Sequence, residues 1–516
     1  MVDGTLQIVL HDNPDFPIFA SPSKKVDDIT LGLFNSGKLI IGQKEIQLSL
    51  ENLKIERERS HQFQLLSFQW LNRVIDCRGF EEGATVLQRY WSDVLKPLIS
   101  TIHRSKSEPF FMAWNDHAYA LRTVVLSKMY ILSSNDFRES IEEMLHECIE
   151  FLNDETNYDA LSNHGWDQAK ALLIASILLD NDPNLGMQRF RDELMHAFSK
   201  EGIHVENSPH YHIHMLNNLI YSMELFVEIG VPKSFIDEMM NTAKSTILYY
   251  QVITRENGTI PLIGDSYNQP PNLNQITKKF IQRHKNEIAQ QDFFPFPITG
   301  YCYWKYEWNG HAIHFSLKNS HLSRYHRHDD DLSLTLNIGG VDVFLDGGLY
   351  KYEEKNEQRM FLRSPSSHST IVLPDSKPKR KLGYEIKNSL EVGSKMFTAK
   401  SAMWEDCIVS RTVKMVSQNK FDIHDSVDSG AESFEILFQT NCQEIMMAGK
   451  HVILKFDEFS VSIDFSTDDG TVQTELRKSL YSPTYNELVE STTIVIMTDS
   501  NNLSYSISFK TQEVEQ

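Results

Sequence analysis

The sequence predicts a multidomain chain in which a helical half is followed by an antiparallel β-sandwich. Three observations support this fold class. Residues 61–295 carry apolar side chains at the 3.6-residue spacing of helices. Residues 296–516 instead consist of short segments that alternate between apolar and polar side chains and are broken by Gly, Asn and Asp. The length of 516 residues allows two or three domains with a sizeable core.

The first 60 residues are a mixed segment of open role. Strand-like pieces such as LQIVL and KLIIGQKEIQLSL occur there, but they indicate no domain type. The start, MVDGTLQIVLHDNPDF, lacks a basic stretch followed by an apolar run, so it does not resemble a secretory signal. We therefore expect a cytoplasmic protein, or a periplasmic or secreted one whose leader has been removed.

The helical half contains segments such as HAYALRTVVLSKMYIL, QAKALLIASILLD and YHIHMLNNLIYSMELFVEIG. Several are apolar on more than one face, as expected for helices that pack in two layers. Their short polar connections predict a stack of antiparallel helical hairpins. A linker is expected near NEIAQQDFFPFPITG. Beyond it, LSLTLNIGG, SFEILFQT and SVSIDFS are typical of the strands of a sandwich.

Composition argues against several classes of protein. A formal net charge of −20 disfavours a nucleic-acid-binding surface, which needs a basic stripe. No run approaches 18 consecutive apolar residues, so no membrane span is predicted. The five cysteines include no CxxC pair and are odd in number, which indicates buried or stray thiols, not a disulfide framework.

The densest polar cluster is HLSRYHRHDDDLS, which contains His326 and His328. On a strand edge, their spacing would put both rings on one face. Asp346 ends the next predicted strand and His368 begins another. Adjacent antiparallel strands can thus bring His328, Asp346 and His368 together as a set suited to zinc or a similar ion. The alternative is a group of surface histidines beside a solvated acidic run.

Two polar clusters of the helical half lie at predicted helix starts. NHGWDQAKALL places Asn163 and His164 before an apolar helix, where Asn163 could be no more than an N-cap. EGIHVENSPHYHIHML places Glu206 and Tyr211 around Pro209, which suits a first helical turn. Each cluster therefore has a purely structural interpretation beside a functional one.

A third segment, FMAWNDHAYALR, contains Trp114, His117 and Arg122. The indole of Trp114 could stack on a sugar ring, but a tryptophan in this setting is more often part of the core.

Together these segments resemble the heparinase II/III family of polysaccharide lyases over roughly residues 100–375. A short P-x-I-G-D-S piece, from Pro261 to Ser266, also matches. Ser369 stands where the family commonly has Asn, and the run Asp329–Asp331 is denser in acid than usual, which bears on sugar preference. Four motifs match in order: N-H-x-x-[ED] at Asn163, His164 and Asp167; E-x-S-P-x-Y-H from Glu206 to His212; H-x-H-x-D-x-L-S from His326 to Ser333, continuing to Asp346; and R-(x)n-H-[NS]-T at Arg363, His368 and Thr370.

The resemblance implies an (α/α) toroid of helical hairpins followed by an antiparallel β-sandwich. It also implies β-elimination, in which the C5 proton of a uronate is removed and the O4-linked sugar is expelled. By resemblance, Asn163 would hold the uronate carboxylate with help from His164. Tyr211 would protonate the leaving oxygen, and His326 would be the second acid or base.

The resemblance also gives the remaining site residues. His117, Glu206 and Arg363 are candidates for substrate binding. His328, Asp346 and His368 would hold one divalent ion, zinc or similar, with a mainly structural role that aims His326. The expected partner is an anionic polysaccharide, so the site must be locally positive within an acidic chain. The oligomeric state is left open.

Three other functions stay open at this point. A uronate C5-epimerase needs the same carboxylate neutraliser and two proton carriers, but it keeps the O4 bond. A hydrolytic metalloenzyme fits the HxHxDD run, although it leaves the helical half, Tyr211 and Asn163 unexplained. A non-catalytic glycan-binding or capsule-associated protein could use the same scaffold.

Overall fold

A computed structural model of the chain describes residues 38–41, 44–47, 59–69, 92, 112, 114–132, 135–284, 291–320, 322–379, 388–405, 407–428, 433–466 and 471–512. The chain divides into two compact units. The first comprises Met1–Ala197 and Tyr221–Met239, and the second comprises Phe198–Ile220 and Met240–Gln516. Along the described chain, the long helices precede the antiparallel sheets, which confirms the predicted fold class.

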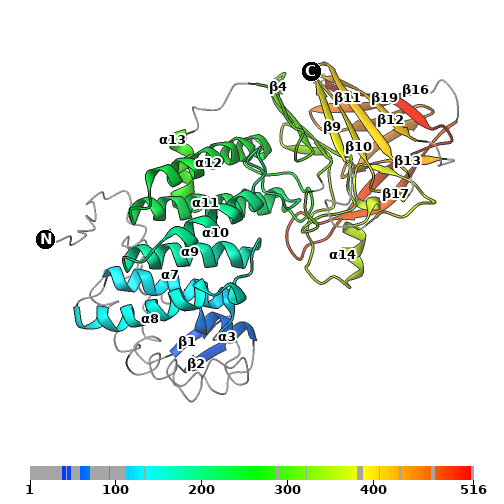
Figure 1. Cartoon of the computed structure of the whole chain (residues 1–516). Coiled ribbons are helices and arrows are strands. Elements are labelled where there is room, and N and C mark those ends of the chain that lie inside the picture. Colours follow the sequence, from blue (N-terminus) through cyan, green and yellow to red (C-terminus); the bar gives the residue numbers. More distant parts are fainter. Residues whose placement is uncertain are drawn as a thin grey trace. The chain divides into compact units, whose positions relative to one another are not determined.

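The described part of the first unit consists mainly of helices (Figure 1). Helix α9 contacts α7, α8 and α10, and most of its residues are buried. Gly186 allows α10 to approach α9 closely, because a Cβ there would lie 2.8 Å from the Leu173 Cα. A hairpin of two short strands near the N-terminus matches the strand-like KLIIGQKEIQLSL. The elements are β1 (Lys38–Ile41), β2 (Lys44–Gln47), α3 (Arg59–Leu66), α7 (Asp116–Leu132), α8 (Asn135–Asn153), the 3-10 turn η2 (Glu155–Asn157), α9 (Asn163–Leu178) and α10 (Asn184–Ala197).

Two long helices contribute to both units. The first half of α11 (Pro209–Glu228) and the second half of α12 (Lys233–Ile253) belong to the second unit, together with α13 (Gln275–His284).

Three antiparallel sheets form most of the second unit. Their strand orders are β3-β4-β5-β6-β7, β17-β18-β13-β8 and β14-β15-β16-β19-β12-β11-β10-β9. The strands are β3 (Phe293–Phe296), β4 (Tyr301–Trp308), β5 (His311–Lys318), β6 (Ser333–Ile338), β7 (Val341–Phe344), β8 (Ile371–Val372), β9 (Ser389–Gly393), β10 (Met396–Ser401), β11 (Val409–Ser417), β12 (Lys420–Val427), β13 (Phe434–Thr440), β14 (Glu444–Ala448), β15 (His451–Lys455), β16 (Phe459–Ser466), β17 (Val472–Tyr481), β18 (Val489–Thr498) and β19 (Asn502–Thr511). Short helical turns α14 (Glu357–Leu362) and η4 (Pro365–Ser367) separate β7 from β8.

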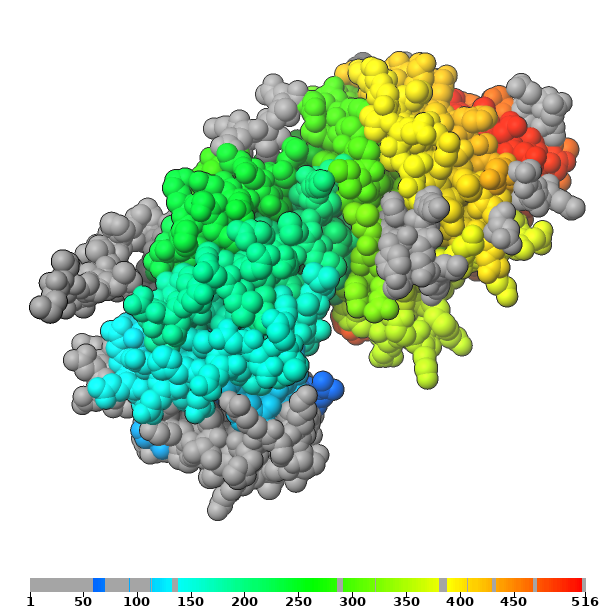
Figure 2. Space-filling view, viewed as in Figure 1, coloured from blue at the N-terminus to red at the C-terminus, as the bar shows by residue number. Residues whose placement is uncertain are grey.

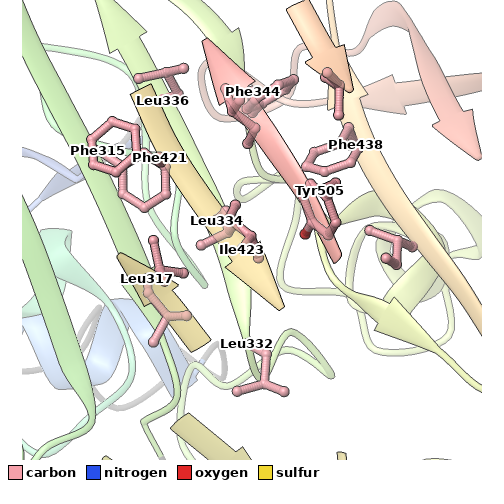
Figure 3. Close-up of a cluster of buried hydrophobic side chains, with 14 of the residues drawn as sticks. Phe315, Leu317, Leu332, Leu334, Leu336, Phe344, Phe421, Ile423, Phe438 and Tyr505 are labelled. Carbon is pink, nitrogen blue, oxygen red and sulfur yellow. The ribbon is translucent and has the colours of Figure 1, made fainter. Parts of the chain in front are cut away.

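The core of the second unit lies between the eight-stranded sheet and the two smaller ones. Strands β12 and β19 alternate buried and less buried side chains, as their period-2 sequences predict. Figure 3 shows Phe315 of β5 against Phe421 of β12, with ring centroids 4.5 Å apart. Strand β6 is buried at all six positions, so the loops at its ends are attached to a rigid element.

Two composition-based expectations bear on the described residues. Cys148, Cys302, Cys407 and Cys442 are buried free thiols, as predicted, and Cys77 lies outside the described residues. Within the described ranges, we find no helix that combines the length and apolarity needed to cross a bilayer.

Candidate active site

Asp265 joins three cationic or potentially cationic side chains in the second unit. Its Oδ2 lies 2.9 Å from His326 Nδ1, and its Oδ1 lies 2.9 Å from His328 Nε2. Arg359, on α14, donates to both carboxylate oxygens. Burial raises the pKa of Asp265, but the hydrogen bonds from these partners outweigh it and hold the pKa well below its usual range. Asp265 lies in the P-x-I-G-D-S segment, for which the sequence predicted no role.

Gly264 allows three backbone segments to meet beside Asp265. Its φ is +55°, and a Cβ there would lie 2.2 Å from Asn207 O and 2.7 Å from His326 O. The Asn207 amide then donates to Ser323 O at 2.8 Å and to Tyr325 O at 2.9 Å. The loop that carries His326 is therefore fixed on both sides.

The predicted strand geometry for His326 and His328 is wrong. Both precede β6 in a loop, and His326 has a φ of +54°, which no strand residue adopts. The two rings still converge, but they do so on the Asp265 carboxylate. His326 Nε2 lies 3.4 Å from Glu206 Oε2, and the same oxygen lies 3.3 Å from His204 Nε2. Glu206, a predicted substrate-binding residue, is thus a neighbour of His326.

The Tyr211 ring is stacked on the His326 ring, with centroids 3.4 Å apart and an interplanar angle of 18°. The Tyr211 hydroxyl lies 2.8 Å from the hydroxyl of Tyr352. Burial raises the pKa of Tyr211, and the carboxylates of Asp265 and Glu206 add to this effect against the hydrogen bond with Tyr352. The phenol is therefore protonated at neutral pH and can act as a proton donor.

The start of α11 sets the position of Tyr211. Ser208 precedes the helix, and its Oγ accepts the Tyr211 N–H at 3.4 Å while it donates to Asp265 O at 2.8 Å. Pro209 is the first helical residue, as predicted. His212, the next motif residue, is buried and bonded to the His204 N–H at 3.2 Å and to Thr246 O at 3.1 Å. His212 therefore supports the structure beneath Tyr211.

Arg363, the third predicted substrate-binding residue, lies at the C-terminal end of α14. Its guanidinium donates to the carboxylate of Glu354 and, at 3.4 Å, to Arg327 O.

A second buried cluster lies in the loops that precede β6, follow β7 and follow η4. One potential ligand atom from each of Asp330, Asp346 and His368 lies within 4.8 Å of the other two, and all three residues are fully buried. Four buried atoms there have no hydrogen-bond partner: His368 Nε2, Asp346 Oδ2, Asp330 Oδ2 and His328 Nδ1. Unpaired buried nitrogen and carboxylate atoms are costly, and a cation would satisfy them.

This cluster differs in one member from the predicted metal set. Asp346 and His368 are present, and their side chains are hydrogen-bonded to each other. Asp330, which Lys318 also contacts, joins this group, and His328, the third predicted ligand, lies beside it with an unpaired Nδ1 and a ring centroid 5.3 Å from that of His368. In the sequence, Asp330 is the acidic residue of the H-x-H-x-D-x-L-S motif, but the resemblance assigned it no ligand role.

The first unit contains its own group of titratable side chains. His164 Nδ1 lies 2.8 Å from Asp116 Oδ2 and 3.6 Å from Asp159 Oδ2. The hydrogen bond to Asp116 raises the pKa of His164 against its partial burial. His117, a predicted substrate-binding residue, stacks on His164 with ring centroids 4.3 Å apart, and its Nε2 lies 2.9 Å from Asp167 Oδ2.

Asn163 is exposed and is the first residue of α9. The N-cap is Ser162, whose Oγ accepts the Gly165 N–H at 3.0 Å, so the interpretation of Asn163 as a cap is wrong. Its amide is available for another partner.

Trp114 packs against Tyr119 and Phe151, with ring centroids 5.5 and 6.1 Å apart, which confirms the core interpretation. Arg122 is buried and donates to Leu66 O at 3.1 Å. Both residues are therefore structural.

Comparison with known proteins gives consistent matches. The model described as "Heparinase II/III N-terminus" matches residues 42–290, and "Heparinase II/III-like, C-terminal" matches residues 289–510. A heparin-sulfate lyase of Bacteroides thetaiotaomicron is 22% identical over 464 residues, which are 80% of this chain and 65% of that protein. A heparin-sulfate lyase of Bacteroides stercoris is 21% identical over 242 residues, 42% of this chain and 36% of that protein. The chain thus spans less than two thirds of the length of these relatives.

Solved structures show the same fold. The heparan sulfate lyase of Pedobacter heparinus aligns with a TM-score of 0.78 at 16% identity and covers 97% of this chain and 86% of its own. A mutant form of that lyase aligns equally well, with 17% identity over 96% of this chain and 85% of its own.

Proposed function

The chain belongs to the heparinase II/III-like family, and on this premise we propose that it is a polysaccharide lyase that cleaves uronic-acid-containing glycans by β-elimination. The observation that carries the proposal is the stacked pair of Tyr211 and His326. A phenol held in its protonated form lies against an imidazole that two carboxylates orient. Elimination needs such a pair, since one proton leaves C5 and another must reach the departing O4.

The roles of the pair follow from their hydrogen bonds. Asp265 is a carboxylate, so the His326 Nδ1 donates to it and the tautomer is fixed. Proton exchange therefore falls to Nε2, which makes His326 the second acid or base. Tyr211 gives its proton to O4 as the C4–O4 bond breaks. Asp265 and Arg359 position His326 and do not themselves react.

Carboxylate neutralisation is assigned to Asn163 and His164 of the first unit. The C5 proton becomes acidic only when the negative charge of the uronate is balanced. The exposed amide of Asn163 can hydrogen-bond a carboxylate. The neighbouring His164, whose pKa the hydrogen bond with Asp116 raises, is the second proposed donor to that carboxylate. His117, Glu206 and Arg363 remain proposed substrate-binding residues.

The relatives named heparin-sulfate lyase make heparan sulfate the first polymer to test. We propose an anionic glycosaminoglycan or similar acidic polysaccharide as the partner.

The proposal includes one divalent ion, zinc or similar, held by Asp330, Asp346 and His368. The unpaired buried atoms of this cluster fit such an ion, and His328 is a further candidate through Nδ1. When bound, the ion would neutralise buried carboxylate charge and stiffen the loop before β6. The full burial of these ligands favours a structural role over the hydrolytic one, which needs an open coordination position.

The test is incubation of the protein with heparan sulfate and other uronate polymers, followed by the absorbance of unsaturated uronate. A lyase produces this absorbance. An epimerase changes the uronate without it, and a binding protein does neither. Tyr211→Phe should stay folded and lose turnover by about 10²–10⁴-fold, the scale of a general acid or base. Near-normal turnover in that variant would remove Tyr211 from the mechanism.

A further inference from the structure

Tyr352 lies in the segment between β7 and α14, and 47% of its surface is exposed. Figure 2 shows residues around 350–360, in yellow-green, projecting at the surface. Tyr352 is nevertheless held in place on two sides. Its hydroxyl is bonded to that of Tyr211 at 2.8 Å, and its ring lies 5.8 Å from the ring of Tyr485.

The backbone of this segment is anchored to two other loops. The Leu349 N–H donates to Ser266 O at 3.1 Å, and the Asn486 N–H donates to Tyr350 O at 2.9 Å. Ser266 follows Asp265 directly, so the segment is tied to the loop that orients His326. The exposure of Tyr352 therefore does not mean that its hydroxyl is free to move away from Tyr211.

The surroundings of Tyr211 decide which hydroxyl donates. The carboxylates of Asp265 and Glu206 raise the pKa of Tyr211, while the hydrogen bond with Tyr352 lowers it. Burial and the hydrogen bond with Tyr211 raise the pKa of Tyr352, whereas the hydrogen bond with Tyr267 lowers it. The imidazoles of His326 and His210 also neighbour the Tyr211 ring, with centroids 3.4 and 6.3 Å away, and Tyr267 raises the pKa of Tyr211 as well. The 2.8 Å contact allows the Tyr352 hydroxyl to donate to the Tyr211 oxygen once Tyr211 has given up its proton.

We propose that Tyr352 is a positioning residue that donates a hydrogen bond to the Tyr211 oxygen and stabilises its phenolate form during proton transfer. The inference rests on the proposed lyase activity. As His326 takes the C5 proton through Nε2, the C4–O4 bond breaks and Tyr211 passes its proton to O4. Negative charge then remains on the phenol oxygen until solvent reprotonates it, and His326 returns the C5 proton to solvent. A donor already aimed at that oxygen makes Tyr211 a stronger acid at the moment of transfer.

The test compares Tyr352→Phe with the wild type by two readouts. The first is the pKa of a fluorotyrosine placed at position 211, followed by fluorine NMR, which needs no substrate. This pKa should rise when the Tyr352 hydroxyl is removed. The second is steady-state cleavage, in which kcat should fall by about 10- to 100-fold, the worth of a hydrogen bond to a charged group, with little change in KM.

Tyr485→Phe is the matched control, because its ring neighbours Tyr352 and it lies in the same exposed region. It should leave both readouts unchanged. An unchanged pKa at position 211 in Tyr352→Phe overturns the inference, as does an equal effect of the control. A raised pKa in a protein that cleaves no uronate polymer overturns the proposed function, and the catalytic use of Tyr352 with it.

Discussion

The carboxylate of Asp265 forms hydrogen bonds with His326, His328 and Arg359. The Asp265 side chain is almost completely buried. Asp265→Asn keeps the volume but leaves the Arg359 guanidinium buried without a counter-charge. We expect the free energy of unfolding to fall by about 3–5 kcal/mol, the usual cost of breaking a buried ion pair. Denaturant unfolding measures it.

Arg359→Met in the Asp265→Asn background is the control for that prediction. If the cost comes from the unpaired guanidinium, the double variant should be more stable than Asp265→Asn alone. A loss below about 1 kcal/mol in the single variant would mean that the pair is neutral in the fold.

Asn163 and Ser162 offer a comparison between a functional and a structural residue at one helix start. Ser162→Ala removes the cap of α9 and should cost about 1 kcal/mol of stability with turnover kept. Asn163→Ala should keep the melting temperature and lose about 10²-fold in turnover, the scale of a lost charge-stabilising donor. Calorimetry measures the stability of each variant, and the absorbance assay measures its turnover. Asn163→Ala with normal turnover would contradict the proposed role.

The sequence predicted which residues form the candidate site better than it predicted their contacts. The motif spacing identified His326 and Tyr211, which the structure stacks. The partner that orients His326 is Asp265, 61 residues earlier. Nothing local to Asp265 indicates that contact, since it depends on Gly264 bringing distant backbone segments together. Long-range polar contacts of this kind leave no periodic signal in the sequence.

At the scale of elements, periodicity predicted helices well and failed at one loop. Helices α7, α9 and α11 occur where 3.6-residue spacing indicated them. The segment before β6 was predicted as a strand edge because His326 and His328 alternate with polar neighbours. Its buried side chains are polar ones that pair with distant partners, as His328 does with Asp265 at 2.9 Å, so alternation there has no relation to a sheet face.

Helix α11 gives the fold a sensitivity to acid through His212. Burial lowers the pKa of His212 from 6.5 to about 3, so the folded protein holds it neutral while the unfolded chain protonates it. Because the unfolded state binds more protons between these values, unfolding free energy should fall as pH drops from 6.5 towards about 3. His212→Gln should flatten this dependence. Urea unfolding at several pH values measures it.

His314 of β5 is a second buried histidine whose pKa burial lowers to about 3. Replacing His212 or His314 alone should therefore remove only part of the dependence of the unfolding free energy on pH. Replacing both should remove the contributions of both histidines. If His212→Gln leaves the slope of unfolding free energy against pH unchanged, the imidazole is already accessible to protons in the folded state.

For the whole molecule, the order of helices and then strands followed from the change in hydrophobic period. The toroid was expected only from the family resemblance. Periodicity reports which face of an element is buried, and it does not specify which element covers that face. The strand orders, such as β13 between β18 and β8, depend on contacts far apart in the chain and could not be predicted.

The proposed metal cluster connects elements of two sheets. Asp330 precedes β6 and Asp346 follows β7, both in the five-stranded sheet, whereas His368 precedes β8 of the four-stranded sheet. An ion bound there would join the two smaller sheets to each other. It would bind the folded state alone, so its removal should destabilise the whole sandwich.

We expect the purified protein to contain close to one equivalent of divalent metal, and a chelator should lower its melting temperature. Binding at 100 times the dissociation constant contributes about 2.7 kcal/mol to stability. Asp330→Asn should lower metal content and melting temperature, whereas Asp329→Asn, outside the cluster, should retain the metal. Elemental analysis and calorimetry with and without chelator measure both quantities. If Asp330→Asn keeps its full metal content, the ion is held by the originally predicted His328, Asp346 and His368. If the wild type contains no metal and melts identically in chelator, the buried carboxylates must be neutralised by Lys318, which already donates to Asp330, and by a protonated His368.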